Sequence, residues 1–223
     1  MTPRPDHPRL VLFDVDGTLV DSLDHIMAAM ERAFAARDLP PPSRAAVREI
    51  IGLSLEEAMA RLVPALSAEA CRALAAAYRQ AFFDLHSRGG ADAPLFAGID
   101  RVIAALAADP VTLLGVATGK SRRGLDRLFA AHDLARHFHT LQTADAHPSK
   151  PHPAMVLAAL AETGVRPERA VMVGDTTYDM EMARAAGIVP IGVAWGYHSP
   201  AALMAAGAQA IAGDPVALLD MLD

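Results

Sequence analysis

The sequence predicts an α/β protein: a doubly wound, Rossmann-like parallel sheet core with an inserted α-helical cap domain. Three observations lead to this class. Short apolar runs alternate with helical stretches along most of the chain, as in sheets whose parallel strands are joined by helices. One long gap, from Ser22 to about Arg88, has helical periodicity and almost no strand-like alternation. Chemically reactive residues follow the ends of several apolar runs.

The elements follow from periodicity and from the residues that interrupt it. Strands are expected at residues 10–13, 112–117, 139–142, 170–173, 190–193 and, more weakly, 210–212, with core helices at 100–108, 124–132, 153–163 and 179–186. The gap contains four expected helices, at 23–37, 43–50, 55–62 and 67–85, separated by prolines and glycine. We therefore predict a core of residues 1–20 and 91–223 and a cap of residues 21–90, joined again through 87–94.

Composition restricts the class of protein. No apolar run in the 223 residues approaches the roughly 18 needed to span a membrane, and the first nine residues lack the apolar centre of a signal peptide. The net charge of −6, without a cluster of lysine or arginine, argues against nucleic-acid binding. The single Cys71 fits a reducing compartment and a buried structural role. These features predict a cytoplasmic protein with no membrane or nucleic-acid partner, and they leave its oligomeric state open.

Two carboxylates lie directly after the first predicted strand. Asp14 and Asp16 are two residues apart, so on an extended strand they point to the same side, and Gly17 lets the chain turn sharply. One carboxylate can then attack a substrate atom while its neighbour handles a proton. Asp21, in the same segment, is interpreted as a hinge residue or a residue at the start of a helix rather than a catalyst.

Complementary groups follow the later predicted strands. Thr118 and Gly119 follow the second strand, Lys150 precedes Pro151, and Asp175 follows the fourth strand, with Asp179 four residues further on. The carboxyl ends of parallel strands meet at one edge of an open sheet, where ligands bind. The sequence therefore predicts a phosphoryl-transfer centre at that edge, between core and cap.

These ordered motifs resemble the haloacid dehalogenase-like hydrolase superfamily, most closely its phosphoglycolate phosphatase-like branch (subfamily IA). The resemblance implies a mobile cap and Mg²⁺ bound by Asp14, Asp175 and the backbone carbonyl of Asp16. A cation is needed because a carboxylate nucleophile and a phosphate ester repel each other. We expect Asp14 to form an aspartyl-phosphate with a small phosphomonoester and Asp16 to act as acid and then base.

The remaining roles follow from charge and position. Lys150 and Thr118 would bind phosphate oxygens together with neighbouring backbone N–H groups such as that of Gly119. Asp179 would support Lys150 or a metal-bound water, or be a direct metal ligand. Cap residues should select the substrate, and the candidates are Arg48, Ser54 and Arg61; phosphoglycolate is the leading substrate by resemblance.

Rival functions are judged by the residues that each requires. A dehalogenase needs no acid such as Asp16. A sugar-phosphate mutase of this superfamily tends to carry a basic residue after the cap turn, where this chain has Leu55, and a phosphonate hydrolase needs a cap lysine that is absent here. A noncatalytic phosphate-binding or interaction module is the alternative outside the enzymes. The nine histidines lack zinc-site spacing, and the loop 195–198 either borders the site or is structural.

Overall fold

The computed structural model describes residues 8–87 and 92–222. Its centre is a parallel sheet of six strands in the order β3-β2-β1-β4-β5-β6. The predicted return of the chain from cap to core falls partly on residues 88–91, outside the described residues. The strands are β1 (Arg9–Phe13), β2 (Thr112–Thr118), β3 (Phe138–Thr143), β4 (Ala170–Gly174), β5 (Val189–Val193) and β6 (Ala210–Ala212).

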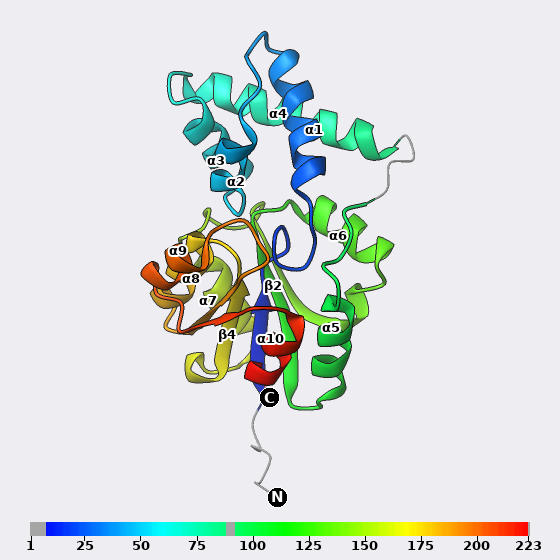
Figure 1. The fold of residues 1–223 in the computed structure, drawn as a ribbon, viewed down its shortest axis with the longest axis vertical. Coiled ribbons are helices and arrows are strands. Elements are labelled where there is room, and N and C mark those ends of the chain that lie inside the picture. Colours follow the sequence, from blue (N-terminus) through cyan, green and yellow to red (C-terminus); the bar gives the residue numbers. More distant parts are fainter. Residues whose placement is uncertain (1–7, 88–91, 223) are drawn as a thin grey trace, which may run out of the picture.

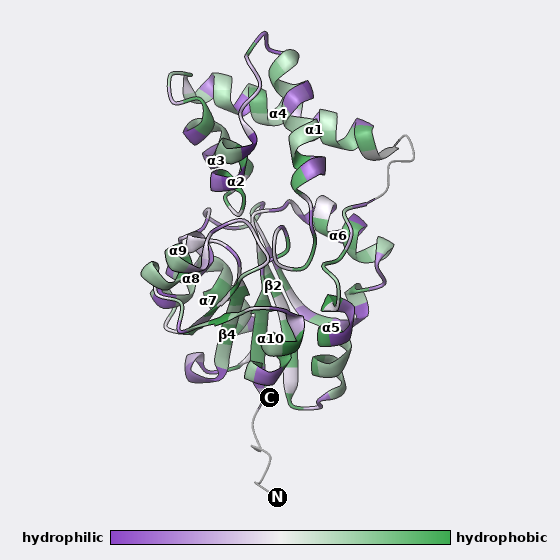
Figure 2. Cartoon of the chain, in the orientation of Figure 1, coloured by the Kyte–Doolittle hydropathy of each residue, from purple (hydrophilic) through white to green (hydrophobic). Residues whose placement is uncertain are grey.

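Helices cover both faces of the sheet. Alternate residues of β1 face opposite layers: Val11 and Phe13 pack in one apolar cluster, and Leu10 and Leu12 in another. The first cluster includes residues of α5 (Ile99–Ala108), α6 (Arg122–Ala131) and α10 (Pro215–Leu222), and the second includes α7 (Ala154–Thr163) and α8 (Thr177–Ala185). In Figure 2 the central strands are hydrophobic, and hydrophilic residues gather on the outer helices and loops. The predicted doubly wound core is thus confirmed.

Four helices form a separate layer beyond one edge of the sheet (Figure 1). They are α1 (Leu23–Ala35), α2 (Arg44–Ile50), α3 (Leu55–Leu62) and α4 (Ala68–Ser87), and they share an apolar cluster that includes Met30, Phe34, Met59 and Leu74. Cys71 is buried in that cluster, in agreement with a packing role. This layer is the predicted helical cap, whereas its limits at residues 20/21 and 90/91 stay predictions.

Two helices of the structure were not expected from the sequence, α9 (Pro200–Ala205) and α10. Both are short and begin at local caps: the Ser199 side chain accepts from the Ala202 N–H, and Asp214 accepts from Ala217. In addition, α8 begins two residues before its expected start because Thr176 caps it in a reciprocal pair with Asp179. Two 3-10 turns, Ala135–His137 and Pro167–Arg169, precede β3 and β4.

The fold brings the residues that follow several strands to one edge of the sheet. Strands β1, β2 and β4 are neighbours, so the residues that follow them emerge together at the edge of the sheet below the cap. Among the described residues, no helix has the length and apolar character required to cross a bilayer.

Candidate active site

The centre of the site is a buried cluster of charges below the cap. Lys150 Nζ lies 2.8 Å from Asp14 Oδ1 and 2.6 Å from Asp179 Oδ1, and all three side chains are almost fully buried. Asp14 is fixed by β1, whose ladder continues in a hydrogen bond from the Asp14 N–H to the Val173 carbonyl, 2.9 Å away. One ammonium is therefore shared by two carboxylates that come from different ends of the chain.

Asp175 lies beside this cluster and is held by two donors. The Thr18 hydroxyl donates to Asp175 Oδ1 at 2.8 Å, and the Tyr197 N–H donates to Oδ2 at 2.8 Å. Gly17 passes so close that a methyl group on its α-carbon would lie 2.2 Å from Asp175 Oδ2, and its φ is +90°. Glycine is thus required at position 17 both by the turn and by the neighbouring carboxylate.

The Asp179 carboxylate is fully engaged by the protein. Its Oδ1 accepts from Lys150, while its Oδ2 accepts from the N–H of Thr176 at 3.1 Å and from the Thr176 hydroxyl at 2.7 Å. Asp179 therefore contacts Lys150 on the side away from its other partners, and its supporting role in the reaction stays a prediction.

The three carboxylates could hold a divalent cation. Oxygen atoms of Asp14, Asp175 and Asp179 lie within 4.8 Å of one another, and Asp14 Oδ2 is buried without a hydrogen-bond partner among the described residues. Hard oxygen ligands of this kind suit Mg²⁺. Within the described part of the chain, Asp14 Oδ2 has no hydrogen-bond partner, and each Asp175 oxygen accepts a single bond from a neutral donor. Asp179 instead has one oxygen paired with the Lys150 ammonium and the other accepting two hydrogen bonds, so Asp14 and Asp175 are the better candidates for direct ligands.

Burial and repulsion dominate the electrostatics in the absence of a cation. Burial raises the pKa of Asp14 to about 7, even though Lys150 lowers it. Burial and the charges of Asp14 and Asp179 raise the pKa of Asp175 well above its usual range. Burial alone would lower the pKa of Lys150, but the two neighbouring carboxylates outweigh it and raise that pKa. The site therefore contains more negative charge than one lysine can balance, which favours cation binding.

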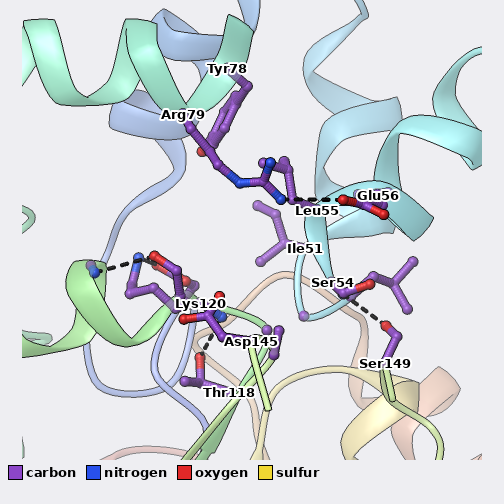
Figure 3. A pocket seen from close by; sticks show the side chains of 18 of the residues that line it. Ile51, Ser54, Leu55, Glu56, Tyr78, Arg79, Thr118, Lys120, Asp145 and Ser149 are labelled. Carbon is purple, nitrogen blue, oxygen red and sulfur yellow. Dashed lines mark hydrogen bonds and ion pairs between the residues drawn. The ribbon is translucent and has the colours of Figure 1, made fainter. Parts of the chain in front are cut away.

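A cleft of about 900 Å³ opens between this cluster and the cap. Figure 3 shows its two walls: Ile51, Tyr78 and Arg79 on the cap side, and Thr118 and Lys120 on the core side. Asp14 and Asp16 line the cleft together with Thr118 and Gly119. A methyl group on Gly119 would lie 2.6 Å from the Gly52 carbonyl oxygen, so this glycine permits the cap turn to approach the end of β2.

The cap candidates occupy different positions. Ser54 lines the cleft, and its N–H donates to the Ser149 hydroxyl at 2.8 Å. Arg48 donates to the Tyr197 carbonyl at 3.0 Å, and Arg61 donates to the Tyr178 hydroxyl at 2.9 Å, so both join cap to core. Neither arginine is among the residues that line the cleft, and their contact with a substrate stays a prediction.

Two residues of the site, Thr18 and Lys120, had no role in the sequence analysis, and for the loop 195–198 the sequence allowed either a site or a structural role. Thr18 was part of the first motif and orients Asp175, and Lys120 pairs with Asp16 Oδ1 at 2.9 Å. The loop 195–198 borders the site: besides the Tyr197 N–H, the Trp195 indole donates to the Thr18 carbonyl at 3.1 Å. Its position after the fifth strand, at the same sheet edge, was the signal that favoured the first of these two roles.

Comparison with known proteins gives one matching family and relatives with several names, among them a protein named tyrosine-protein kinase PtkA from Mycobacterium tuberculosis that is 35% identical over 193 residues, covering 86% of this chain and 64% of that protein. The family described as haloacid dehalogenase-like hydrolase matches residues 11–193. The chain is 40% identical over 205 residues to a protein named probable phosphatase IndB from Dickeya dadantii, covering 91% of this chain and 88% of that protein. It is 33% identical to a protein named phosphoglycolate phosphatase from Rhodospirillum rubrum, covering 96% and 91%.

A solved structure resembles the whole fold. It is a haloacid dehalogenase-like family hydrolase from Streptococcus pneumoniae, with a TM-score of 0.84 and 26% identity, and the superposition covers 97% of this chain and 99% of that one.

Proposed function

Because the chain belongs to the haloacid dehalogenase-like hydrolase family and is a phosphatase of its phosphoglycolate phosphatase-like branch, we propose that it hydrolyses a small phosphomonoester. The reaction would pass through an aspartyl-phosphate on Asp14, with Mg²⁺ as cofactor. One observation carries the proposal. A buried carboxylate with an unpartnered oxygen, Asp14 Oδ2, lies beside Lys150 and Asp175 on the floor of the cleft. That combination provides a nucleophile, a positive charge and an oxygen ligand set in one place.

In the first half of the reaction, an Asp14 carboxylate oxygen forms a bond to phosphorus as the bond from phosphorus to the alcohol oxygen breaks. Asp16 donates a proton to the leaving oxygen. Lys150 lies close enough to Asp14 to balance charge on the nonbridging phosphate oxygens, and the Thr118 hydroxyl adds a directed hydrogen bond. The alcohol then leaves the cleft.

In the second half, a water molecule attacks the phosphorus of the aspartyl-phosphate and the now ionised Asp16 takes its proton. The bond between phosphorus and the Asp14 oxygen breaks, which restores the carboxylate and releases inorganic phosphate. Asp14, Asp175 and the Asp16 carbonyl would hold Mg²⁺, which when bound neutralises charge between nucleophile and ester. Thr18 and Tyr197 keep Asp175 in a fixed orientation throughout.

The substrate proposal is phosphoglycolate, supported by the relative that bears its name. The core groups bind the phosphoryl group that all candidate esters share, so selection falls to the cleft and the cap. We propose that Arg48, Ser54 and Arg61 of the cap contact the substrate. We also propose the core and cap limits given above, and the cytoplasm as the location of the protein.

The function is tested with a panel of phosphomonoesters, with Mg²⁺ present or chelated, on the parent, Asp14→Asn and Asp16→Asn. We expect Asp14→Asn to lose about 10⁴-fold or more in kcat and Asp16→Asn about 10² to 10⁴-fold. Asp21→Asn is the matched control because Asp21 belongs to the same segment and is exposed. Mass spectrometry of rapidly quenched samples should find one phosphoryl group on the parent and none on Asp14→Asn.

The outcomes separate the candidate functions. Metal-independent turnover, or full activity of Asp14→Asn, contradicts the mechanism. An isomeric sugar phosphate in place of inorganic phosphate identifies a mutase, and the absence of turnover on every ester supports a binding module.

A further inference from the structure

Lys120 is a cation of the cleft to which the mechanism above assigns no part. It follows Gly119 directly after β2, and its side chain is 14% exposed. Its ammonium lies 2.9 Å from Asp16 Oδ1. Figure 3 shows Lys120 on the core wall, across the cleft from Tyr78 and Arg79 of the cap. The cation is therefore next to the reacting groups and is open to a ligand in the cleft.

The position of Lys120 fixes which part of a substrate it can reach. Asp16 must contact the leaving oxygen in order to protonate it. An ammonium in contact with Asp16 then lies close to whatever the alcohol carries near that oxygen. Lys150, by contrast, is on the side of Asp14 and the phosphoryl group. The two lysines thus face the two ends of the ester.

The cap completes the surroundings of this ammonium. The Phe82 ring centroid of α4 lies 5.7 Å from Lys120 Nζ, and Tyr78 stacks on Phe82 with ring centroids 5.9 Å apart. Burial and the charge of Asp16 raise the pKa of Tyr78, so its hydroxyl stays protonated and remains a hydrogen-bond donor. A cation with an aromatic wall and a hydroxyl donor favours a compact anion over a neutral alcohol.

Two other cations that line the cleft, Arg79 and Arg127, are engaged by acids outside the reacting centre. Arg79 pairs with Glu56 at 3.5 Å, and Arg127 pairs with Asp92 at 2.8 Å. Lys120 differs because its partner is Asp16, the group that must contact the leaving oxygen in the proposed reaction. A substrate that engages Asp16 without supplying an anion would leave this ammonium poorly paired in a partly buried place, at a cost in binding.

We propose that Lys120 is a specificity-determining residue whose ammonium binds a carboxylate carried by the leaving alcohol one or two carbons from the ester oxygen. Phe82 and Tyr78 form the cap side of this subsite. The proposal rests on the proposed phosphatase function and adds to it the residue that distinguishes acidic from neutral alcohols.

The test compares two esters that differ in the proposed ligand group, 2-phosphoglycolate and 2-hydroxyethyl phosphate. Lys120→Met should lower kcat/KM for the acidic ester by about 10- to 100-fold, mainly through KM. Any effect of this variant on Asp16 is common to both esters, so the neutral ester should lose about tenfold less in kcat/KM than the acidic ester does. Lys120→Arg should recover part of the loss on the acidic ester. Arg123→Met is the control for positive charge in the cleft. Arg123 lines the cleft, but its Cζ lies 4.4 Å from the centroid of the Phe83 ring. This variant should change kcat/KM for both esters equally.

Equal losses on both esters in Lys120→Met would overturn the proposal and assign Lys120 to the support of Asp16 instead. Unchanged preference for the acidic ester would overturn it as well. Calorimetric binding of the two esters to Asp14→Asn, with and without Lys120→Met, gives a readout that needs no turnover. If the parent hydrolyses no ester, the phosphatase function fails, while these binding curves still decide whether Lys120 selects the carboxylate.

Discussion

Replacement of Lys150 by methionine tests the charge balance on which the site depends. Methionine keeps most of the length of the lysine side chain and removes the ammonium. Asp14 and Asp179, which lie 2.8 and 2.6 Å from that ammonium, then lose their shared cation in a place that water does not reach. The variant leaves two buried carboxylates that repel each other.

The magnitude follows from the burial of the pair. Breaking a buried ion pair by removing one partner costs about 3–5 kcal/mol, because the remaining charge is uncompensated. For a chain of this size that corresponds to a fall of about 10 °C in Tm. Arg44→Met is the matched control: Arg44 pairs with Asp24 on the surface, with side chains 56% and 81% exposed, and we expect a cost below about 1 kcal/mol.

The measurement is urea unfolding at pH 8 with divalent metal chelated, so that no cation replaces the ammonium. Adding Asp179→Asn to Lys150→Met removes one stranded charge, and the double variant should be about 2 kcal/mol more stable than the sum of the single effects. If Lys150→Met is as stable as the Arg44→Met control, the reasoning is refuted. The buried ammonium would then contribute no more to the free energy of unfolding than a solvent-exposed one.

Two further predictions concern the same cluster. Because burial raises the pKa of Asp14 from 3.8 to about 7, unfolding between these pH values releases a proton, and metal-free parent should lose stability as pH rises through this window. Between pH 4 and pH 8, the free energy of unfolding of the parent, measured in urea, should fall by about 4 kcal/mol relative to that of Asp14→Asn. Mg²⁺ should reduce this fall. If the difference in unfolding free energy between the two proteins does not change with pH, Asp14 is not a buried ionised carboxylate. Gly17→Ala should weaken Mg²⁺ binding and lower kcat by about 100-fold or more, since its methyl group would lie 2.2 Å from Asp175 Oδ2. Gly164→Ala is the control, because Gly164 also has a positive φ, +68°, but an added methyl group would meet nothing within 4 Å. It should lower the free energy of unfolding by about 1–2 kcal/mol and leave Mg²⁺ binding unchanged. Equal Mg²⁺ affinity in the two variants would mean that Asp175 is not a ligand.

Local pattern was enough for the elements and for the order of the chemical groups along the chain. The apolar run from Leu10 to Phe13 indicated a strand, and the structure divides its residues between two apolar clusters on opposite faces of the sheet. Short helices were harder, because α9 and α10 depend on caps and on packing against neighbouring elements rather than on a long periodic face.

What the sequence by itself determined is where strands end and which reactive residues follow them, since these depend on the backbone preferences of a few adjacent residues. Only the tertiary structure decided which groups touch. The Lys150 ammonium reaches Asp14 across more than half of the chain, the Tyr197 N–H fixes Asp175, and Lys120 turns to Asp16 while Arg48 turns away from the cleft. Such contacts depend on how distant segments pack and how loops direct their side chains, which no local pattern encodes.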